Sequence, residues 1–303
     1  IIVNTGGEDY TEDTIRLIQA DYPEIKKTFV PLQSRNLSKR KLAITLGIKA
    51  ASYPIVLLTS ANATPAGPDW LSSIMNQFQE GADIVIGTSV MENTESGETI
   101  GKMRAFDTMK TLLRRIPEAL KGKPVGADSA NLAYRKELFF DNKGFCETLN
   151  LNYGDDDIFI SEIARDHIVA VDLTPHSIVT LHENTPARIY DLERLSRSFT
   201  QSKLRRTPFI LSGFQDLLWW IWLIASVAGI ICTLPSLIGV ICILLIAAVL
   251  IIPVSIKWQK AARAISLPAH TSILTYLSLA NPIISLRYKM QFGKKARNYT
   301  WQT

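Results

Sequence analysis

Residues 55–87 read IVLLTSANATPAGPDWLSSIMNQFQEGADIVIG and contain the unit whose repetition organises the first part of the chain. Ile55–Thr59 is a short apolar run with β-branched residues, as expected of a buried strand. A polar turn follows, then a helical pattern over Pro68–Gln79 and a second strand pattern over Asp83–Gly87. Strand, helix and strand at this spacing predict an α/β domain with a mixed, mostly parallel sheet.

The same alternation continues on both sides of this stretch. Helical patterns cover Thr11–Ala20 and Ser38–Ala51. Further strands are predicted at Ile1–Asn4, Thr28–Pro31, Asn131–Arg135, Ile168–Asp172 and Ser177–Thr180. Ligands of such sheets bind beyond the carboxyl ends of the strands, so polar residues just after each strand are the candidates for chemistry. Because the chain begins inside a strand pattern, we expect it to be truncated, with an N-terminal strand missing.

The character of the chain changes near residue 207, where charged residues become rare. Phe209–Thr233 and Leu237–Ile256 are apolar runs whose only charge is Asp216. Each is long enough to cross the hydrocarbon core of a bilayer, which takes about 20 apolar residues. Basic residues flank both outer ends, so the positive-inside rule predicts a transmembrane hairpin with both ends in the cytoplasm. A buried hairpin of a soluble protein is the alternative.

A third apolar segment, over about 271–287, is shorter and contains Asn281 and Pro282. We interpret it as an interfacial or re-entrant helix, because spanning would carry the basic residues after it to the outer side. Residues 1–206 then form one domain and residues 207–303 a membrane region. The net charge of +5 collects around the apolar runs, which indicates a membrane-side partner and no nucleic acid.

Two groups of polar residues near the N-terminus are candidates for nucleotide binding. Asn4, Thr5 and Asp9 follow the first strand, where small polar residues let a nucleotide approach the backbone. An ordinary strand-to-helix turn explains them equally. Arg35 precedes a helix that begins with Lys39-Arg40-Lys41 and could bind a diphosphate, although a solvated basic face has the same composition.

Ser60 and Asn62 follow the strand Ile55–Thr59 and are separated by one residue. Carboxylates at these two positions would form a site for a hard divalent cation. The side chains present are neutral. They offer oxygen ligands to Mg²⁺ or Mn²⁺ with much less electrostatic attraction than carboxylates would give.

Gly154-Asp155-Asp156-Asp157 precede a predicted helix over Ile158–Arg165. Adjacent carboxylates repel one another unless a site gives them a use, and one of them could act as a general base. The alternative is a helix-capping aspartate with two solvated neighbours. Close to the first apolar run, a basic segment fits either a clamp on a diphosphate or a strip that binds anionic lipid. It contains Gln201, Lys203, Arg205 and Arg206.

Four segments in this order resemble glycosyltransferase family 2, whose members have the GT-A nucleotide-sugar-binding fold. They are IIVNTGGEDYT (1–11), SRNLSKRKLAITLGIKAASYPIVLLTSANATPAGPDWL (34–71), GADSANLAYRKELF (126–139) and GDDDIFISEIA (154–164). The last two are particularly similar to the membrane-tailed bacterial branch. The resemblance covers residues 1–206 and implies an inverting transfer of a sugar from a nucleotide-sugar donor to an acceptor hydroxyl at the cytoplasmic face of the inner membrane.

The resemblance also implies roles for individual residues. Asp156 is the expected catalytic base, with Asp155 as the alternative, and Asn131 lies on the acceptor-side strand of the nucleotide-sugar site. Ser60 and Asn62 stand where the family has its DxD motif, so Asn62 is the position implied for a metal ion. The segment Gln201–Arg206 is similar to the family's QxxRW region and would bind the diphosphate.

The implied partners are a nucleotide-sugar donor, a glycan or lipid-linked acceptor and membrane lipid. Since the DxD acids are replaced, a catalytically silent scaffold subunit is the competing interpretation. An active enzyme requires Asn62, Asp156 and Arg205 to surround one cleft beside the bilayer.

Overall fold

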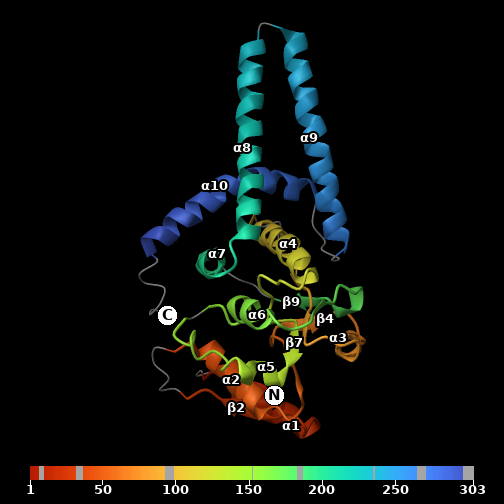
Figure 1. Ribbon diagram of the computed structural model, residues 1–303, viewed down its shortest axis with the longest axis vertical. Coiled ribbons are helices and arrows are strands. Elements are labelled where there is room, and N and C mark those ends of the chain that lie inside the picture. Colours follow the sequence, from red (N-terminus) through yellow and green to blue (C-terminus); the bar gives the residue numbers. More distant parts are fainter. Residues whose placement is uncertain are drawn as a thin grey trace.

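The computed structural model describes residues 1–6, 10–31, 37–92, 99–151, 153–182, 187–234, 236–264 and 271–295. An α/β body carries a long helical hairpin, formed by α8 (Thr207–Thr233) and α9 (Leu237–Ala264), which projects away from it (Figure 1). A further helix, α10 (Thr271–Lys295), crosses the base of the hairpin and contacts both of its helices (Figure 1).

The central sheet of the body has four strands in the order β3 (Ile55–Leu58), β7 (Leu132–Arg135), β5 (Ile84–Ile86) and β8 (Val169–Val171). Strand β7 runs antiparallel to both of its neighbours, while β5 and β8 are parallel. The predicted mixed α/β fold is confirmed. Because β7 is inserted between β3 and β5, the loops that follow β3 and β5 and the loop that precedes β7 meet at one edge.

Two smaller sheets complete the body. One contains β4 (Ala63–Pro65), β9 (Val179–Leu181) and β6 (Ser89–Met91), with β9 antiparallel to β4 and parallel to β6. The other pairs β1 (Ile2–Asn4) with β2 (Lys27–Phe29) in parallel. All seven predicted strands are found within a residue or two at each end, whereas β4 and β6 were not predicted.

The helices of the body are α1 (Thr11–Asp21), α2 (Lys39–Ala50), α3 (Trp70–Gln79), α4 (Thr99–Leu120), α5 (Lys136–Asp141), α6 (Asp157–Ile163) and α7 (Ala187–Lys203). The sequence patterns predicted α1, α2, α3 and α6, but not α4. Helix α4 is hard to predict because it contains Pro117 and because charged side chains such as Arg104 and Asp107 are buried in it. These charges resemble a solvated face and in fact pair with residues of α7.

Aromatic packing fixes helix α6 on the central sheet. Phe159 of α6 contacts Tyr134 of β7 at a ring-centroid distance of 5.7 Å and Phe139 of α5 at 5.5 Å. These rings belong to the main apolar core together with Ile160 and Leu132, which are fully buried. Such ring pairs contribute about 0.5–1.5 kcal/mol each beyond their buried area. The residues immediately before α6 are therefore held by a rigid support.

The hairpin exposes large apolar side chains along its length. Leu211, Ile224 and Leu245 are 69%, 61% and 61% exposed, which water would not favour over so large a surface. Both α8 and α9 are long and apolar enough to cross a membrane. Helix α10 extends to Lys295, beyond the predicted end at 287, and buries Leu274, Asn281 and Tyr288 at seven-residue intervals.

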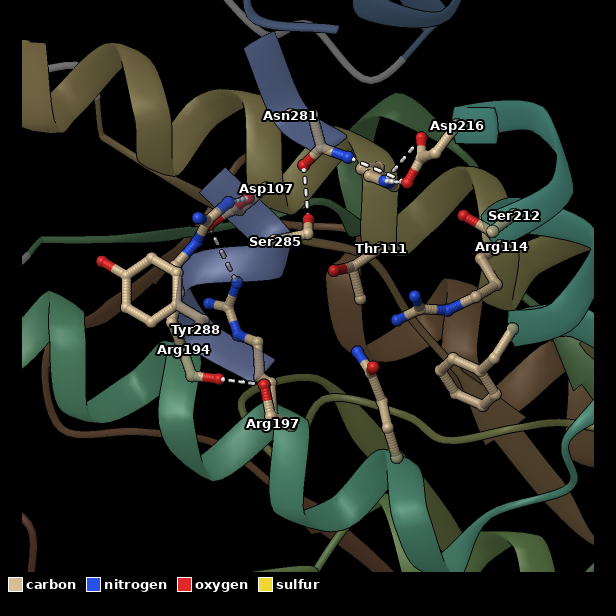
Figure 2. Close-up of a pocket in the computed structure, with 15 residues that line it drawn as sticks. Asp107, Thr111, Arg114, Arg194, Arg197, Ser212, Asp216, Asn281, Ser285 and Tyr288 are labelled. Carbon is tan, nitrogen blue, oxygen red and sulfur yellow. Dashed lines mark hydrogen bonds and ion pairs between the residues drawn. The ribbon is translucent and has the colours of Figure 1, made fainter. Parts of the chain in front are cut away.

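Asp216, the only charge of the apolar runs, faces the body. Its carboxylate lies 3.0 Å from Lys110 Nζ of α4 and accepts a hydrogen bond of 3.2 Å from Asn281 Nδ2 of α10 (Figure 2). Asp216 therefore joins α8 to the body at the tenth residue of the helix. Leu211 and Phe214 lie before it and remain exposed, so the exposed apolar surface of α8 already begins in this first part of the helix.

We expect Asp216→Asn to destabilise the docked hairpin by about 2 kcal/mol, because Lys110 loses the carboxylate that offsets its burial. Burial already lowers the pKa of Lys110. The measurement is thermal unfolding of the full chain in detergent. The double variant with Lys110→Met should recover most of the loss, and an additive double variant would show that the two side chains do not interact.

Candidate active site

The three consecutive aspartates before α6 have three different environments. Asp155 and Asp157 are buried, at 6% and 7% exposure, while Asp156 between them is only partly buried. Gly154, with φ of 88°, permits the sharp turn that leads into this segment, since a side chain there would meet Ile158. The backbone thus points the three carboxylates in different directions.

Asp155 is paired with α2. Its Oδ2 accepts a hydrogen bond of 2.6 Å from Arg40 Nε, and Arg40 also donates to Ser129 Oγ. The Asp155 carboxylate raises the pKa of Arg40, so the guanidinium stays protonated. Of the three basic residues at the start of α2, Arg40 reaches the site, Lys39 is exposed and Lys41 is buried in the core, where it donates to Thr148 O at 2.8 Å.

Asp157 is paired with α4. Its Oδ1 accepts a hydrogen bond from Arg115 Nη2, and its Oδ2 accepts one of 3.4 Å from Thr200 Oγ1 of α7. Gly126 makes room for this pair, because a Cβ at that position would lie 2.1 Å from Asp157 Oδ1. Burial raises the pKa of Asp157, while Arg115 and Arg114 oppose that rise. Asp157 is therefore a structural link between α6, α4 and α7.

Asp156 has no cation at ion-pair distance within the described ranges. It caps α6, since its Oδ1 accepts a hydrogen bond of 2.7 Å from Asp157 N, and its Oδ2 accepts a weak one of 3.4 Å from Ser129 N. Burial and the neighbouring carboxylates of Asp157 and Asp155 raise its pKa well above the ordinary carboxyl value. Partly exposed, without a cationic partner and with a raised pKa, it has the properties of a proton acceptor that is a stronger base than an ordinary carboxylate.

These residues line one cavity of about 470 Å³, within the usual range of about 300–1,000 Å³ for small-molecule sites. The predicted site residues that it contains are Ser60, Asn62, Asp155 and Asp156. The cavity also contains Arg40, from the helix start that was a candidate for diphosphate binding, and five residues that were not predicted to be site residues: Arg115, Asp128, Glu193, Arg197 and Thr200. The cavity lies between the central sheet, α4 and α7.

The residues that follow β3 make a weak site for a divalent cation. Asn62 is exposed, and its Nδ2 donates to His182 O at 3.2 Å. Neither Asn62 nor Ser60 brings a negative charge to a cation. Asp128, the additional carboxylate nearby, accepts hydrogen bonds from Ser89 Oγ and, at 3.0 Å, from Ala130 N. Among the described residues, no cluster of three His, Cys, Asp or Glu side chains could hold a metal ion. The residues therefore do not fit a tightly bound Mg²⁺ or Mn²⁺.

One face of α7 supplies one cation and several polar groups that were not predicted. Glu193, Arg197 and Thr200 recur at helical spacing and line the cavity. Their spacing of three and four residues can be read from the sequence. The predicted basic segment, Gln201–Arg206, lies about one helical turn after Arg197.

The predicted diphosphate-binding residues lie elsewhere. Gln201 lines a second cavity, and Lys203 and Arg205 line a third, where Arg205 pairs with Glu118. Arg206 is exposed at the start of α8. The requirement that Asn62, Asp156 and Arg205 surround one cleft is not met: the first two line one cavity and Arg205 lines another, because α7 ends at Lys203 and the chain turns away. An active site at Asp156 must therefore take its cations from other residues of the same cavity, Arg40 and Arg197.

Asn131 has a structural role in place of the predicted nucleotide-sugar contact. Its side chain is fully buried, donates to Thr88 O at 3.0 Å and to Ser177 O at 2.8 Å, and accepts from Trp70 Nε1 at 3.1 Å. Both N–H donors of the side-chain amide and its oxygen are thus hydrogen-bonded within the protein. Gly87 packs directly against it, since a Cβ there would lie 2.3 Å from the Asn131 amide.

The N-terminal candidates do not reach this cavity. Asn4 forms a local turn in which its Oδ1 accepts a hydrogen bond of 2.9 Å from Gly6 N, and Thr5 is exposed. Neither residue lines the cavity of Asp156. Asp9 and Arg35 lie outside the described residues.

No family model and no curated protein matches the sequence. Among solved structures, the chain is similar to glucosyl-3-phosphoglycerate synthase from Mycobacterium tuberculosis in complex with Mn²⁺ and uridine-diphosphate-glucose, at 16% identity and a TM-score of 0.39, over 67% of each chain. It is also similar to S. aureus TarS 1–349, at 15% identity and a TM-score of 0.38, over 64% of this chain and 53% of that one. Similarities this distant carry no argument about activity, so the assignment depends on the site itself.

Proposed function

We propose that the protein is a glycosyltransferase that transfers a sugar from a nucleoside-diphosphate sugar to an acceptor hydroxyl with inversion. The observation that carries the proposal is the position of Asp156. It is the one member of the aspartate triplet that lacks an arginine partner in the described chain, and it faces a cavity large enough for the donor.

In the proposed reaction Asp156 accepts the proton of the acceptor hydroxyl, and the oxygen forms a bond to the anomeric carbon of the donor. The bond between that carbon and the diphosphate oxygen breaks, and the diphosphate takes the bonding electrons. Arg40 and Arg197 line the same cavity and supply positive charge for the departing oxyanion. The base and the leaving-group cations are thus supplied by α2, α7 and the start of α6. No step depends on a metal ion.

The membrane region supports a location at the cytoplasmic face of the inner membrane. In this proposal residues 1–206 form the catalytic domain, and within residues 207–303 α8 and α9 cross the bilayer while α10 lies at its surface. The basic residues at the outer ends of both apolar runs favour this orientation.

A catalytically silent scaffold is the second candidate, and the neutral pair Ser60 and Asn62 favours it. Hydrolysis or transfer from UDP-glucose, UDP-N-acetylglucosamine and GDP-mannose by the purified full chain separates the two proposals. Turnover that is absent with every donor, both with and without Mn²⁺, would support the scaffold.

If the protein is active, we expect chelation with EDTA to change turnover by no more than about threefold, because arginines replace the metal in stabilising the leaving group. The measurement is donor turnover with EDTA, Mg²⁺ or Mn²⁺. A loss of turnover with EDTA that Mn²⁺ restores would show that Ser60, Asn62 or Asp128 binds a functional cation.

We expect Arg197→Gln to lower kcat/KM by about 100-fold, since it removes one of the cations that face the leaving group. Arg205→Gln serves as the matched control because Arg205 lies at a different cavity, and it should change kcat/KM by less than about threefold. Steady-state kinetics of both variants give the comparison. The reverse order of effects would restore the sequence-based assignment of Arg205.

A further inference from the structure

A second cavity lies between α4, α7, α8 and α10, on the side of the body that carries the hairpin (Figure 2). Its volume is about 150 Å³, too small for a nucleotide-sugar by comparison with the usual range of about 300–1,000 Å³. Four cations and two carboxylates line it: Lys110, Arg114, Arg194, Arg197, Asp107 and Asp216. Positive charge is therefore in excess.

Both carboxylates are already paired. Asp107 accepts hydrogen bonds of 2.6 Å from Arg194 Nε and from Tyr190 OH, and Arg197 lies 3.8 Å away. Asp216 is paired with Lys110, as described above. Neither carboxylate forms an ion pair with Arg114.

Arg114 is the cation left over. Its guanidinium stacks on Phe209 at 4.3 Å from the ring centre, and no carboxylate of the described residues lies at ion-pair distance. Arg114 Nε and Arg194 Nη1 are buried donors without a hydrogen-bond partner in the part of the chain that is described. Burial and the nearby Arg115 lower the pKa of Arg114 to about 10. A partly buried cation without a carboxylate partner is costly, so a site of this kind favours an anion with several acceptor oxygens.

The location of the cavity identifies the source of that anion. Arg114 of α4 lies beside the first part of α8 (Figure 2), where it contacts Phe209. Helix α8 carries exposed apolar side chains such as Leu211. Thr111 and Arg197 line both this cavity and that of Asp156, so the two cavities adjoin. An amphiphile whose acyl chains lie along α8 would bring its headgroup to this point.

We infer that this cavity binds the phosphate of a lipid headgroup through Arg114. Taken together with the proposed function, on which this last step rests, the bound phosphate belongs to the lipid-linked acceptor. The acceptor is thereby held at the edge of the cavity that contains Asp156.

The test uses the full chain, purified in a neutral detergent, and follows its thermal unfolding. Dihexanoyl phosphatidic acid, dihexanoylglycerol and inorganic phosphate are added at equal concentration. A ligand that binds only the folded protein raises the melting temperature, so phosphatidic acid should raise it by several degrees. An equal rise with dihexanoylglycerol, which lacks the phosphate, or with inorganic phosphate, which lacks the lipid, would overturn the inference of a lipid phosphate.

Variants locate the site. Arg114→Gln should abolish the rise, and Arg263→Gln, which removes an exposed arginine near the end of α9, should retain it. Arg114→Lys keeps the positive charge but lacks the planar guanidinium group that binds two phosphate oxygens at once, so the rise should be smaller. This variant gives the same comparison if Arg114→Gln does not fold. An undiminished rise in the Arg114 variants, or an equal loss in Arg263→Gln, would refute the site.

Asp156→Asn separates this inference from the proposed function. The variant should respond to phosphatidic acid like the unaltered protein although it lacks the base. If sugar transfer is never observed but the response depends on Arg114, the lipid site stands and only the acceptor role is lost.

Discussion

Asp156→Asn should lower the rate of sugar transfer by about 10²–10⁴-fold and at the same time raise the melting temperature of the protein. The loss of rate follows from removing the proton acceptor. The gain in stability follows from the raised pKa of Asp156, which burial and the two neighbouring carboxylates cause. Asparagine keeps the side-chain oxygen that caps α6, so the helix retains its first hydrogen bond.

The pH dependence has a definite sign. Because the pKa of Asp156 is higher in the folded protein than in the unfolded chain, its protonated form stabilises the fold. That contribution is complete below the unfolded pKa and is lost as the pH rises through the folded pKa. The stability advantage of Asp156→Asn should therefore vanish in acid and grow as the pH rises from the unfolded toward the folded pKa. Conversely, kcat/KM of the unaltered protein should fall as the pH drops below the folded pKa.

Two comparisons make this prediction decisive. Asp166→Asn alters an exposed aspartate just after α6 and should change neither the rate nor the melting temperature. Melting curves and initial rates between acid and neutral pH supply both readouts. An Asp156→Asn protein with normal turnover would eliminate Asp156 as the base, and a less stable one would mean that its charge stabilises the fold.

Arg115→Gln should destabilise the protein by about 3–5 kcal/mol, because it leaves the carboxylate of Asp157 buried without a cation. The side chains of Arg115 and Asp157 are only 17% and 10% exposed, so water replaces the lost partner poorly. Thr200 and Gly126 close the remaining space around the pair. Chemical denaturation of the full chain in detergent measures the effect.

The double variant Arg115→Gln/Asp157→Asn tests the mechanism of this loss. It removes both charges, so most of the stability should return. Lys121→Gln, immediately after α4, breaks a pair with Glu118 in which the lysine is exposed and should cost less than about 1 kcal/mol. A double variant as unstable as Arg115→Gln would mean that Arg115 acts through packing and not through charge.

The local pattern of the chain was sufficient for most of the strands and for the hairpin. Runs such as Ile84–Ile86 are apolar, β-branched and bounded by turn residues, and such signals depend only on neighbouring positions. The two long apolar helices follow from composition alone. Helix α4 was not predicted, because its charged residues form ion pairs with residues of α7 and α8 that are distant in the sequence. No local pattern reveals such pairs.

The sequence by itself determined the mixed α/β body, the apolar hairpin and the aspartate triplet as a candidate source of the base, because each depends on residues close together in the chain; the choice of Asp156 within the triplet came from the family resemblance. Only the tertiary structure decided which cations accompany that base. It separated three adjacent aspartates by giving two of them arginine partners from α2 and α4, it brought Arg197 to the cavity, and it placed Arg205 at another. Ion pairing and burial act between residues far apart in sequence, so these assignments follow from the packing of the helices and not from residue order.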